Sequence, residues 1–147
     1  MGKSKTVSAV KGKGSIRHNN RNFYAGNVDK NRTKDNIIYK QEPLREAYQK
    51  CFETAIEEYN SIQKRTDRKI DGIDGYMEKI KNSGNGEKLF YETIFQVGNK
   101  HDSHTGTLDG FLCKNILDDY MKKFEERNPH LYVFNAVMHL DEETPHI

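Results

Sequence analysis

The sequence lacks the features that define several classes of protein. Its 147 residues include no Trp, two Cys and three Pro. No apolar run approaches the roughly 20 residues that a membrane-spanning helix needs, so we expect no integral membrane segment. Cys51 and Cys113 are too few for a disulfide framework, and both are predicted to be reduced thiols in the core. Since the start also lacks the apolar part of a secretory signal, a cytoplasmic protein is expected.

Two common site motifs are also missing, and the charge is nearly balanced. There is neither a Gly-x-x-x-x-Gly-Lys phosphate loop nor a Cys-x-x-Cys pair. The net charge is only +2, but residues 1–40 hold ten Lys and Arg against two acids, while residues 41–147 have a net charge of -6. A basic segment on an acidic body predicts one face for a polyanion, and nucleic acid is the favoured partner over a disordered basic leader.

The apolar pattern predicts one α+β domain over residues 1–147. Strands are expected within 5–16, at 37–39, over 89–97 as a central strand, and over 131–140. Helical spacing predicts helices over 43–65, over 74–82, and from Thr107 onward, with residues 17–36 as a polar loop or irregular helix. The predicted apolar face of the last helix comprises Leu108, Phe111, Leu112, Ile116, Leu117, Tyr120, Met121 and Phe124. Strands interleaved with helices on a small sheet favour the α+β class.

The strongest chemical motif directly follows the apolar run 131–138. His139 ends the predicted buried strand, and His146 comes seven residues later, after Pro145. An imidazole pair suits Mn, Zn, Fe, Co or Ni, and an added carboxylate favours a harder ion such as Mn. Glu142 or Asp141 could orient a ligand histidine. The alternative is a polar strand end with two solvated histidines, and we favour the metal site.

A second polar cluster lies in the basic N-terminal segment. Arginine and asparagine side chains can hold phosphate oxygens, and His18, which lies among them, can act as a nucleophile or a base. The candidate DNA-binding residues are Arg17, Asn19, Arg21, Asn27, Lys30 and Arg32. The alternative is a polar loop that contacts nothing.

Two further histidine positions are weaker candidates. The stretch His101-Asp102-Ser103-His104 allows a metal pair or a Ser/His/Asp arrangement, but all four residues lie in one short loop, which is poor geometry for a triad. We therefore predict an exposed loop. His130, beside Pro129, is predicted to be structural or exposed.

Taken together, the two clusters resemble the Mob/Pre (MobV-type) relaxases, a family of bacterial plasmid mobilisation and recombination proteins. That family carries His-Asn-x-Arg near its start and His-x-Asp-Glu-x-Thr-Pro-His-x-His later. The matching segments here are 18–21 and 139–146, and Asn27-Val28-Asp29 lies between them. The resemblance spans nearly the whole chain, although residues 40–130 match only in general layout. It implies an HUH-relaxase-like fold, in which a small antiparallel sheet is packed with helices.

The resemblance also implies an activity. Such a relaxase binds a plasmid or mobile-element transfer origin, nicks one DNA strand as an endonuclease and stays attached to the 5′ phosphate during conjugation. By this analogy His18 is the nucleophile, with Tyr24 as the alternative. His139 and His146 hold a divalent metal, Mn or Mg, and Glu142 is a nearby ligand, orienter or base. Arg21 would position the scissile phosphate.

One departure from the family pattern affects these expectations. The family motif has a further histidine two residues after His146, whereas this chain ends at Ile147. We therefore expect a fragment that ends inside its metal motif, with a fold incomplete at the C-terminus, weakened metal binding and a dimerisation region missing. The alternative function is a DNA-binding module without catalysis. A metal-dependent hydrolase of a small substrate is a third possibility, against which the basic N-terminal segment argues.

Overall fold

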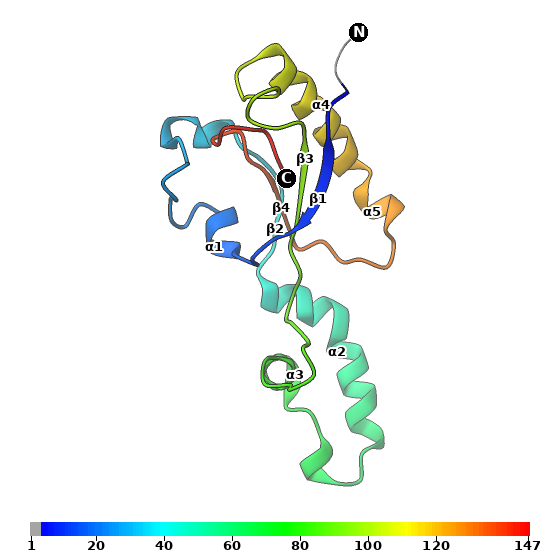
Figure 1. Ribbon diagram of the computed structural model, residues 1–147. Coiled ribbons are helices and arrows are strands. Elements are labelled where there is room, and N and C mark those ends of the chain that lie inside the picture. The colour runs from blue at the N-terminus through cyan, green and yellow to red at the C-terminus, as the bar shows by residue number, and fades with distance from the viewer. Residues whose placement is uncertain (1–3) are drawn as a thin grey trace. The chain divides into compact units, whose positions relative to one another are not determined.

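The computed structural model describes residues 4–147, which divide into two compact units (Figure 1). The first, here called the sheet unit, combines the chain up to Gln41 with Glu92–Ile147. The second, the helical unit, is Glu42–Tyr91. The chain leaves the sheet unit after Gln41 and returns to it at Glu92, so the sheet unit is built from two separate stretches of sequence.

The sheet unit contains two antiparallel strand pairs. β1 (Val7–Lys11) pairs with β3 (Thr93–Val97), and β2 (Ile37–Gln41) pairs with β4 (Asn135–Met138). In the first pair Val7 lies opposite Val97, and in the second Ile37 lies opposite Met138. The register of the second pair shifts between Ile38 and Lys40.

The last two residues of the chain join these pairs. Ile147 exchanges two backbone hydrogen bonds with Phe95 of β3, at 2.8 and 3.0 Å between nitrogen and oxygen. His146 forms bridges to Gln96 on one side and to His139 on the other. β3 is therefore hydrogen-bonded along both edges, as expected for a central strand. The small antiparallel sheet predicted from the sequence is confirmed, and it brings His146 beside the end of β4.

One long helix covers the core of the sheet unit. α4 (Leu108–Lys122) begins at Thr107, whose hydroxyl accepts a hydrogen bond from the Gly110 amide at 3.1 Å, and α5 (Phe124–Arg127) follows it. Cys113 and Leu117, one turn apart, face inward. They join a core cluster that comprises Val97, Cys113, Leu117, Met138 and Leu140.

The predicted apolar face of α4 is wrong in part. Leu108, Phe111, Leu112 and Ile116 are exposed, Leu108 to 75%. The reason lies at Gly110, where an added Cβ would be 2.2 Å from the His104 carbonyl oxygen. Only glycine allows this close approach, and it turns the stripe of Gly110, Cys113 and Leu117 inward.

The segment between β1 and β2 is irregular, as expected, and its helical elements are short. α1 (Ile16–Asn19) begins after Ser15, whose hydroxyl accepts a hydrogen bond from the His18 amide. A 3₁₀ helix, η1 (Lys30–Asp35), begins after Asp29, which caps it through the Asn31 amide. These two short elements carry the polar cluster of the basic segment.

The helical unit contains α2 (Leu44–Ile62), the 3₁₀ turn η2 (Thr66–Arg68) and α3 (Gly72–Lys81). Tyr48, Ile56 and Ile73 form its buried core. The sequence predicted both helices to within three residues. Cys51, expected in the core, is exposed, whereas Cys113 is buried, and neither of them is joined in a disulfide. The helical face that buries Tyr48 and Ile56 leaves Cys51 pointing to solvent.

Two of the predicted strands are longer than the observed ones. β3 begins at Thr93 rather than Leu89, and β4 spans Asn135–Met138 rather than 131–140. Leu131 and Tyr132 are exposed and precede the strand, so their apolar character does not reflect burial in the sheet. Among the described residues, none of the helices has the length and apolar character to cross a membrane.

Candidate active site

The candidate nucleophile, His18, lies on α1 just before an unusual turn. The Arg21 amide donates to the His18 carbonyl at 3.1 Å, and the Asn22 amide donates to the Arg17 carbonyl at 2.8 Å. This pair of bonds is a Schellman turn, in which the residue in the left-handed conformation is usually glycine. Here it is Arg21, with φ of +54°. The turn sends the Arg21 side chain back beneath His18.

Arg21 ties α1 to the loop after β4. Its Nε donates to Asp141 Oδ2 at 2.8 Å and its Nη2 donates to Asp141 Oδ1 at 2.6 Å. The Arg21 side chain is 6% exposed and that of Asp141 is fully buried. Burial opposes ionisation of Asp141, but hydrogen bonds from Arg21, Thr33 and Asn36 outweigh it and lower the pKa of this carboxyl below its ordinary value. The pair stabilises a left-handed backbone that an arginine rarely adopts.

Glu142 lies at the centre of the polar groups. Its Oε1 accepts a hydrogen bond from Arg21 Nη2 at 2.8 Å and lies 3.5 Å from His18 Nε2. Its Oε2 accepts a hydrogen bond from Asn27 Nδ2 at 3.0 Å and lies 3.7 Å from His146 Nε2. The Glu142 carboxylate thus lies between the imidazole rings of His18 and His146.

His139 is buried at the end of β4 and is held from both sides. Asn36 accepts the Leu140 amide through Oδ1, so its Nδ2 faces His139 Nδ1, 3.4 Å away. Nδ1 is therefore the acceptor, and Nε2 carries the proton that it donates to Asn19 Oδ1 at 2.6 Å. The pKa of His139 is lowered to about 3, mainly because the ring is buried and secondly because Arg21 is positively charged. His139 is a neutral imidazole, the form that binds metals.

His146 presents one free ring nitrogen to the site. Its Nδ1 donates a hydrogen bond to the Thr144 carbonyl oxygen at 2.9 Å, which leaves the lone pair on Nε2. Its ring centroid lies 5.3 Å from that of His139. The bridge between the two backbones, described above, holds this spacing.

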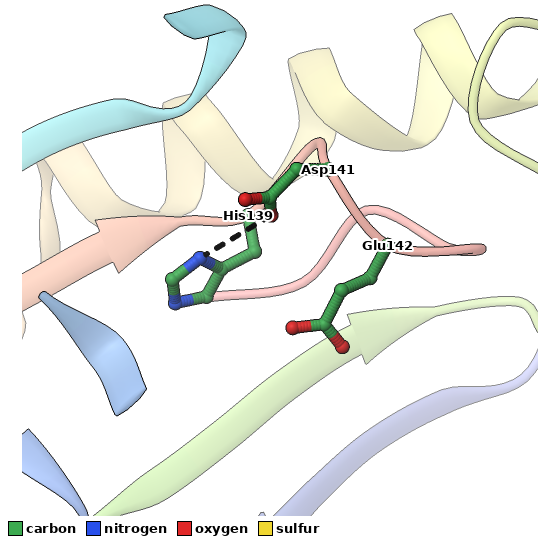
Figure 2. Close-up of side chains that lie close together, drawn as sticks. All are labelled: His139, Asp141 and Glu142. Atoms are coloured by element: carbon green, nitrogen blue, oxygen red, sulfur yellow. Dashed lines mark ion pairs between the residues drawn. The ribbon is translucent and has the colours of Figure 1, made fainter. Parts of the chain in front are cut away.

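The donor groups fit a divalent cation. His139, Asp141 and Glu142 each offer a ligand atom within 4.8 Å of the others, and Figure 2 shows the His139 and Asp141 side chains facing each other. His139 Nδ1 lies 3.7 Å from Asp141 Oδ1. The Asp141 oxygens already accept hydrogen bonds from Arg21 and Thr33, so Glu142, whose side chain is 12% exposed, is the more accessible carboxylate of the group. Two imidazoles and one carboxylate suit Mn among the divalent ions.

A chain of amides, which the sequence did not predict, fixes α1 to the sheet. Asn19 Nδ2 donates to Asn135 Oδ1 on β4, and Asn135 Nδ2 donates to Asn20 Oδ1 at 2.6 Å. Gln41 Nε2, at the end of β2, donates to the same Asn20 oxygen at 3.1 Å. The available signal was a polar residue, Asn135, inside the apolar run 131–138. The network links the helix of His18 to the strand of His139.

The remaining predicted residues lie around this centre. Arg17 and Lys30 are exposed beside the aromatic rings of Phe23 and Tyr24. Arg32 lines a hollow whose walls include Phe111, Lys114, Leu140 and Pro145. The other histidine positions lie outside the site, as expected, since His101, His104 and His130 are all exposed. Ser103, between the first two, is buried instead.

The antiparallel sheet carries an imidazole pair and a carboxylate, and the basic segment carries another imidazole. This is the arrangement expected from the resemblance to the relaxases, a class of DNA-processing enzymes. Residues 16–147 match the model of a family described as plasmid recombination enzyme, Mob_Pre, and the chain belongs to that family. The family predicted from the sequence, and with it an enzyme of plasmid recombination, is confirmed.

A solved structure agrees at the level of the fold. The chain is similar to the MobM relaxase domain, whose crystal structure is Mn-bound and contains plasmid pMV158 oriT DNA of 22 nucleotides. The TM-score is 0.51 at 23% sequence identity, with 98% of this chain and 67% of the MobM chain covered. No curated protein sequence matches the chain. The predicted α+β relaxase fold is therefore confirmed.

Proposed function

We propose that this chain binds the transfer origin of a plasmid or mobile element, cuts one DNA strand through His18 and remains joined to the 5′ phosphate. His139, His146 and Glu142 hold a divalent ion, for which Mn is the favoured candidate. Action on plasmid DNA in the cytoplasm is part of this proposal. The dimer expected from the family resemblance stays a prediction.

The observation that carries the proposal is the position of Glu142 between His18 and His146. Its two oxygens lie 3.5 Å from His18 Nε2 and 3.7 Å from His146 Nε2. A phosphodiester placed against His18 would therefore also lie against the imidazole and carboxylate groups that can hold a cation. The His18 side chain is 31% exposed, so a strand can reach it.

Arg21 selects the reactive nitrogen of His18. Its Nη1 lies 3.2 Å from His18 Nε2 and can only donate, so Nε2 carries the lone pair and Nδ1 carries the proton. Once this hydrogen bond is released, the lone pair of Nε2 attacks the phosphorus, and the bond from phosphorus to the 3′ oxygen breaks. The 3′ oxygen gains a proton, Nδ1 loses one to solvent, and a P–N bond joins the 5′ phosphate to His18.

A bound divalent ion would supply Lewis-acid polarisation of the phosphate and offset the charge that develops on it. His139 contributes a neutral ligand because burial suppresses its protonation. Asp141 contributes by holding the Arg21 guanidinium in place. The role of Arg21 in positioning the phosphate stays a prediction, since its guanidinium hydrogen-bonds Asp141, Glu142 and the His18 carbonyl.

The test uses a randomised library of single-stranded oligonucleotides with Mn. Covalent adducts are captured after denaturation and their DNA is sequenced, which also identifies the cut site. The wild type is expected to yield adducts, and His18→Ala is expected to yield none while still binding DNA. Tyr24→Phe, which removes the alternative nucleophile, is expected to keep forming them.

Two results would change the assignment. Adducts that persist in His18→Ala and vanish in Tyr24→Phe would make Tyr24 the nucleophile. Sequence-selective DNA binding by a folded wild type that never yields adducts, with Mn or Mg, would instead favour the DNA-binding module without catalysis.

A further inference from the structure

Two aromatic side chains are exposed directly after the turn that carries Arg21. Phe23 is 42% exposed and Tyr24 is 43% exposed. The Phe23 ring lies beside the candidate nucleophile, with 5.6 Å between the ring centroids of His18 and Phe23. Large apolar rings next to each other on a polar surface bury little area in the chain itself, and they are available for an outside partner.

A cation lies beside each of these rings. The Arg17 guanidinium carbon lies 6.0 Å from the Phe23 centroid, and Lys30 Nζ lies 5.0 Å from the Tyr24 centroid. Both cations are exposed. We call Arg17, Phe23, Tyr24 and Lys30 the aromatic–basic face. The first 40 residues carry a charge of +8, so the surroundings of this face attract a polyanion.

Exposed rings interleaved with cations match unpaired nucleic acid in particular. Each base has two flat faces that stack on an aromatic ring, and the backbone phosphates pair with Lys and Arg. In a duplex the bases already stack on one another, so the rings gain nothing from a closed double helix. The face therefore favours a strand whose bases are unpaired.

We propose that Phe23 and Tyr24 stack on unpaired bases next to the scissile phosphate, while Arg17 and Lys30 contact the flanking phosphates. The proposal rests on the proposed function, because the face is placed beside the His18 that cuts the strand. It assigns Tyr24 to strand binding through its ring, with no role for its hydroxyl. It also explains how a strand can be held close to His18 without sequence readout.

The binding experiment needs no knowledge of the origin. A thymidine oligonucleotide with one 2-aminopurine base is titrated with protein, and affinity is followed by anisotropy and stacking by quenching of the 2-aminopurine. Phe23→Leu and Tyr24→Leu keep apolar volume but remove the rings, so the fold is retained. Each is expected to weaken single-strand binding roughly tenfold, and the double variant more. Quenching should disappear in the double variant, and binding to a closed duplex should be unchanged.

Matched variants make the result specific. Tyr24→Phe restores the ring and is expected to recover the affinity that Tyr24→Leu loses. Tyr59→Leu removes an aromatic side chain of similar exposure, 38%, from α2 in the helical unit and should bind as the wild type does. Equal single-strand affinity of the double variant and the wild type would overturn the proposal, as would a loss shared equally by single strand and duplex.

The two proposals fail separately. If the wild type forms no adducts but loses single-strand affinity in the double variant, the cutting reaction is wrong and the stacking surface remains. If adducts form through His18 and the double variant binds normally, the stacking surface alone is wrong.

Discussion

Arg21 and Asp141 form a two-point ion pair across 120 positions of sequence, at 2.6 and 2.8 Å between nitrogen and oxygen. The pair joins the turn after α1 to the loop after β4. Since both side chains are almost completely shielded from water, each charge depends on the other for compensation. The contact thus places His18 beside Glu142, and stability and activity are expected to depend on the same bond.

Removing one partner of this pair should be costly. Arg21→Ala leaves Asp141 buried without its counter-ion, and we expect the free energy of unfolding to fall by about 3 kcal/mol. Arg21→Lys should restore only part of this loss, because an ammonium cannot donate in the two-point geometry. Urea denaturation followed by circular dichroism measures both.

The control for this prediction is Arg45→Ala. Arg45 also makes a two-point contact, with Asp74, but both side chains are more than half exposed. Water screens such a pair, so little change is expected. If Arg21→Ala and Arg45→Ala had the same effect, burial would not be what makes the Arg21–Asp141 contact strong.

The stability of the metal-free protein should depend on pH through His139. Its native pKa is about 3, against 6.5 for an ordinary histidine. Below pH 6.5 the unfolded chain binds a proton that the native chain does not bind, so the free energy of unfolding falls as the pH falls. The expected slope from this residue is about 1.4 kcal/mol per pH unit down to about pH 3.

Denaturation in EDTA at several values between pH 4.5 and 7 measures this slope. His139→Gln removes the titrating group and should flatten it. The lowered pKa of Asp141 affects stability in a lower pH range. Its contribution to the free energy of unfolding is present above about pH 4 and is lost only as the pH falls further. An equal slope in wild type and His139→Gln would show that His139 accepts a proton without cost.

The sequence predicted the parts of the fold that local chemistry controls. α2 follows from a long helical repeat, and α4 begins at Thr107 because its hydroxyl can cap the first turn. The residues of the candidate site were proposed from two motifs, one around His18 and one around His139, and neither motif supplies the whole candidate site by itself. Their meeting follows from the pairing of β2 with β4, which brings the two ends of the sheet unit together.

Other features depend on long-range geometry and could not be predicted. Nothing in the local sequence indicates that Arg21 takes a left-handed conformation, because that position usually holds glycine. Asn36 and Thr33 contact the site only because η1 lies against the loop after β4, where Asp29 donates its amide to the Asp141 carbonyl at 2.7 Å. Side-chain partners more than 100 positions apart require the register of the fold.

Metal binding should distinguish two neighbouring acids. Glu142→Gln removes a ligand charge between the two imidazoles, and Mn affinity measured by calorimetry is expected to fall by about tenfold or more. Glu143→Gln is the matched control, since its side chain is 62% exposed and its nearest cation, Lys100, lies 4.0 Å away. Loss of affinity in Glu143→Gln, with Glu142→Gln unchanged, would mean that the cation is held outside the site described here.

Asn135 should act as a positioning residue for His18. Asn135→Leu keeps the size of the side chain but breaks the amide chain that holds Asn19 and Asn20 to β4. We expect adducts to form about tenfold more slowly, because α1 loses its fixed position, while affinity for single-stranded DNA is unchanged. Asn115→Leu, on the exposed side of α4, is the control and should react at the wild-type rate. If Asn135→Leu lowered stability and left the rate of adduct formation intact, the amide chain would support the fold without positioning the nucleophile.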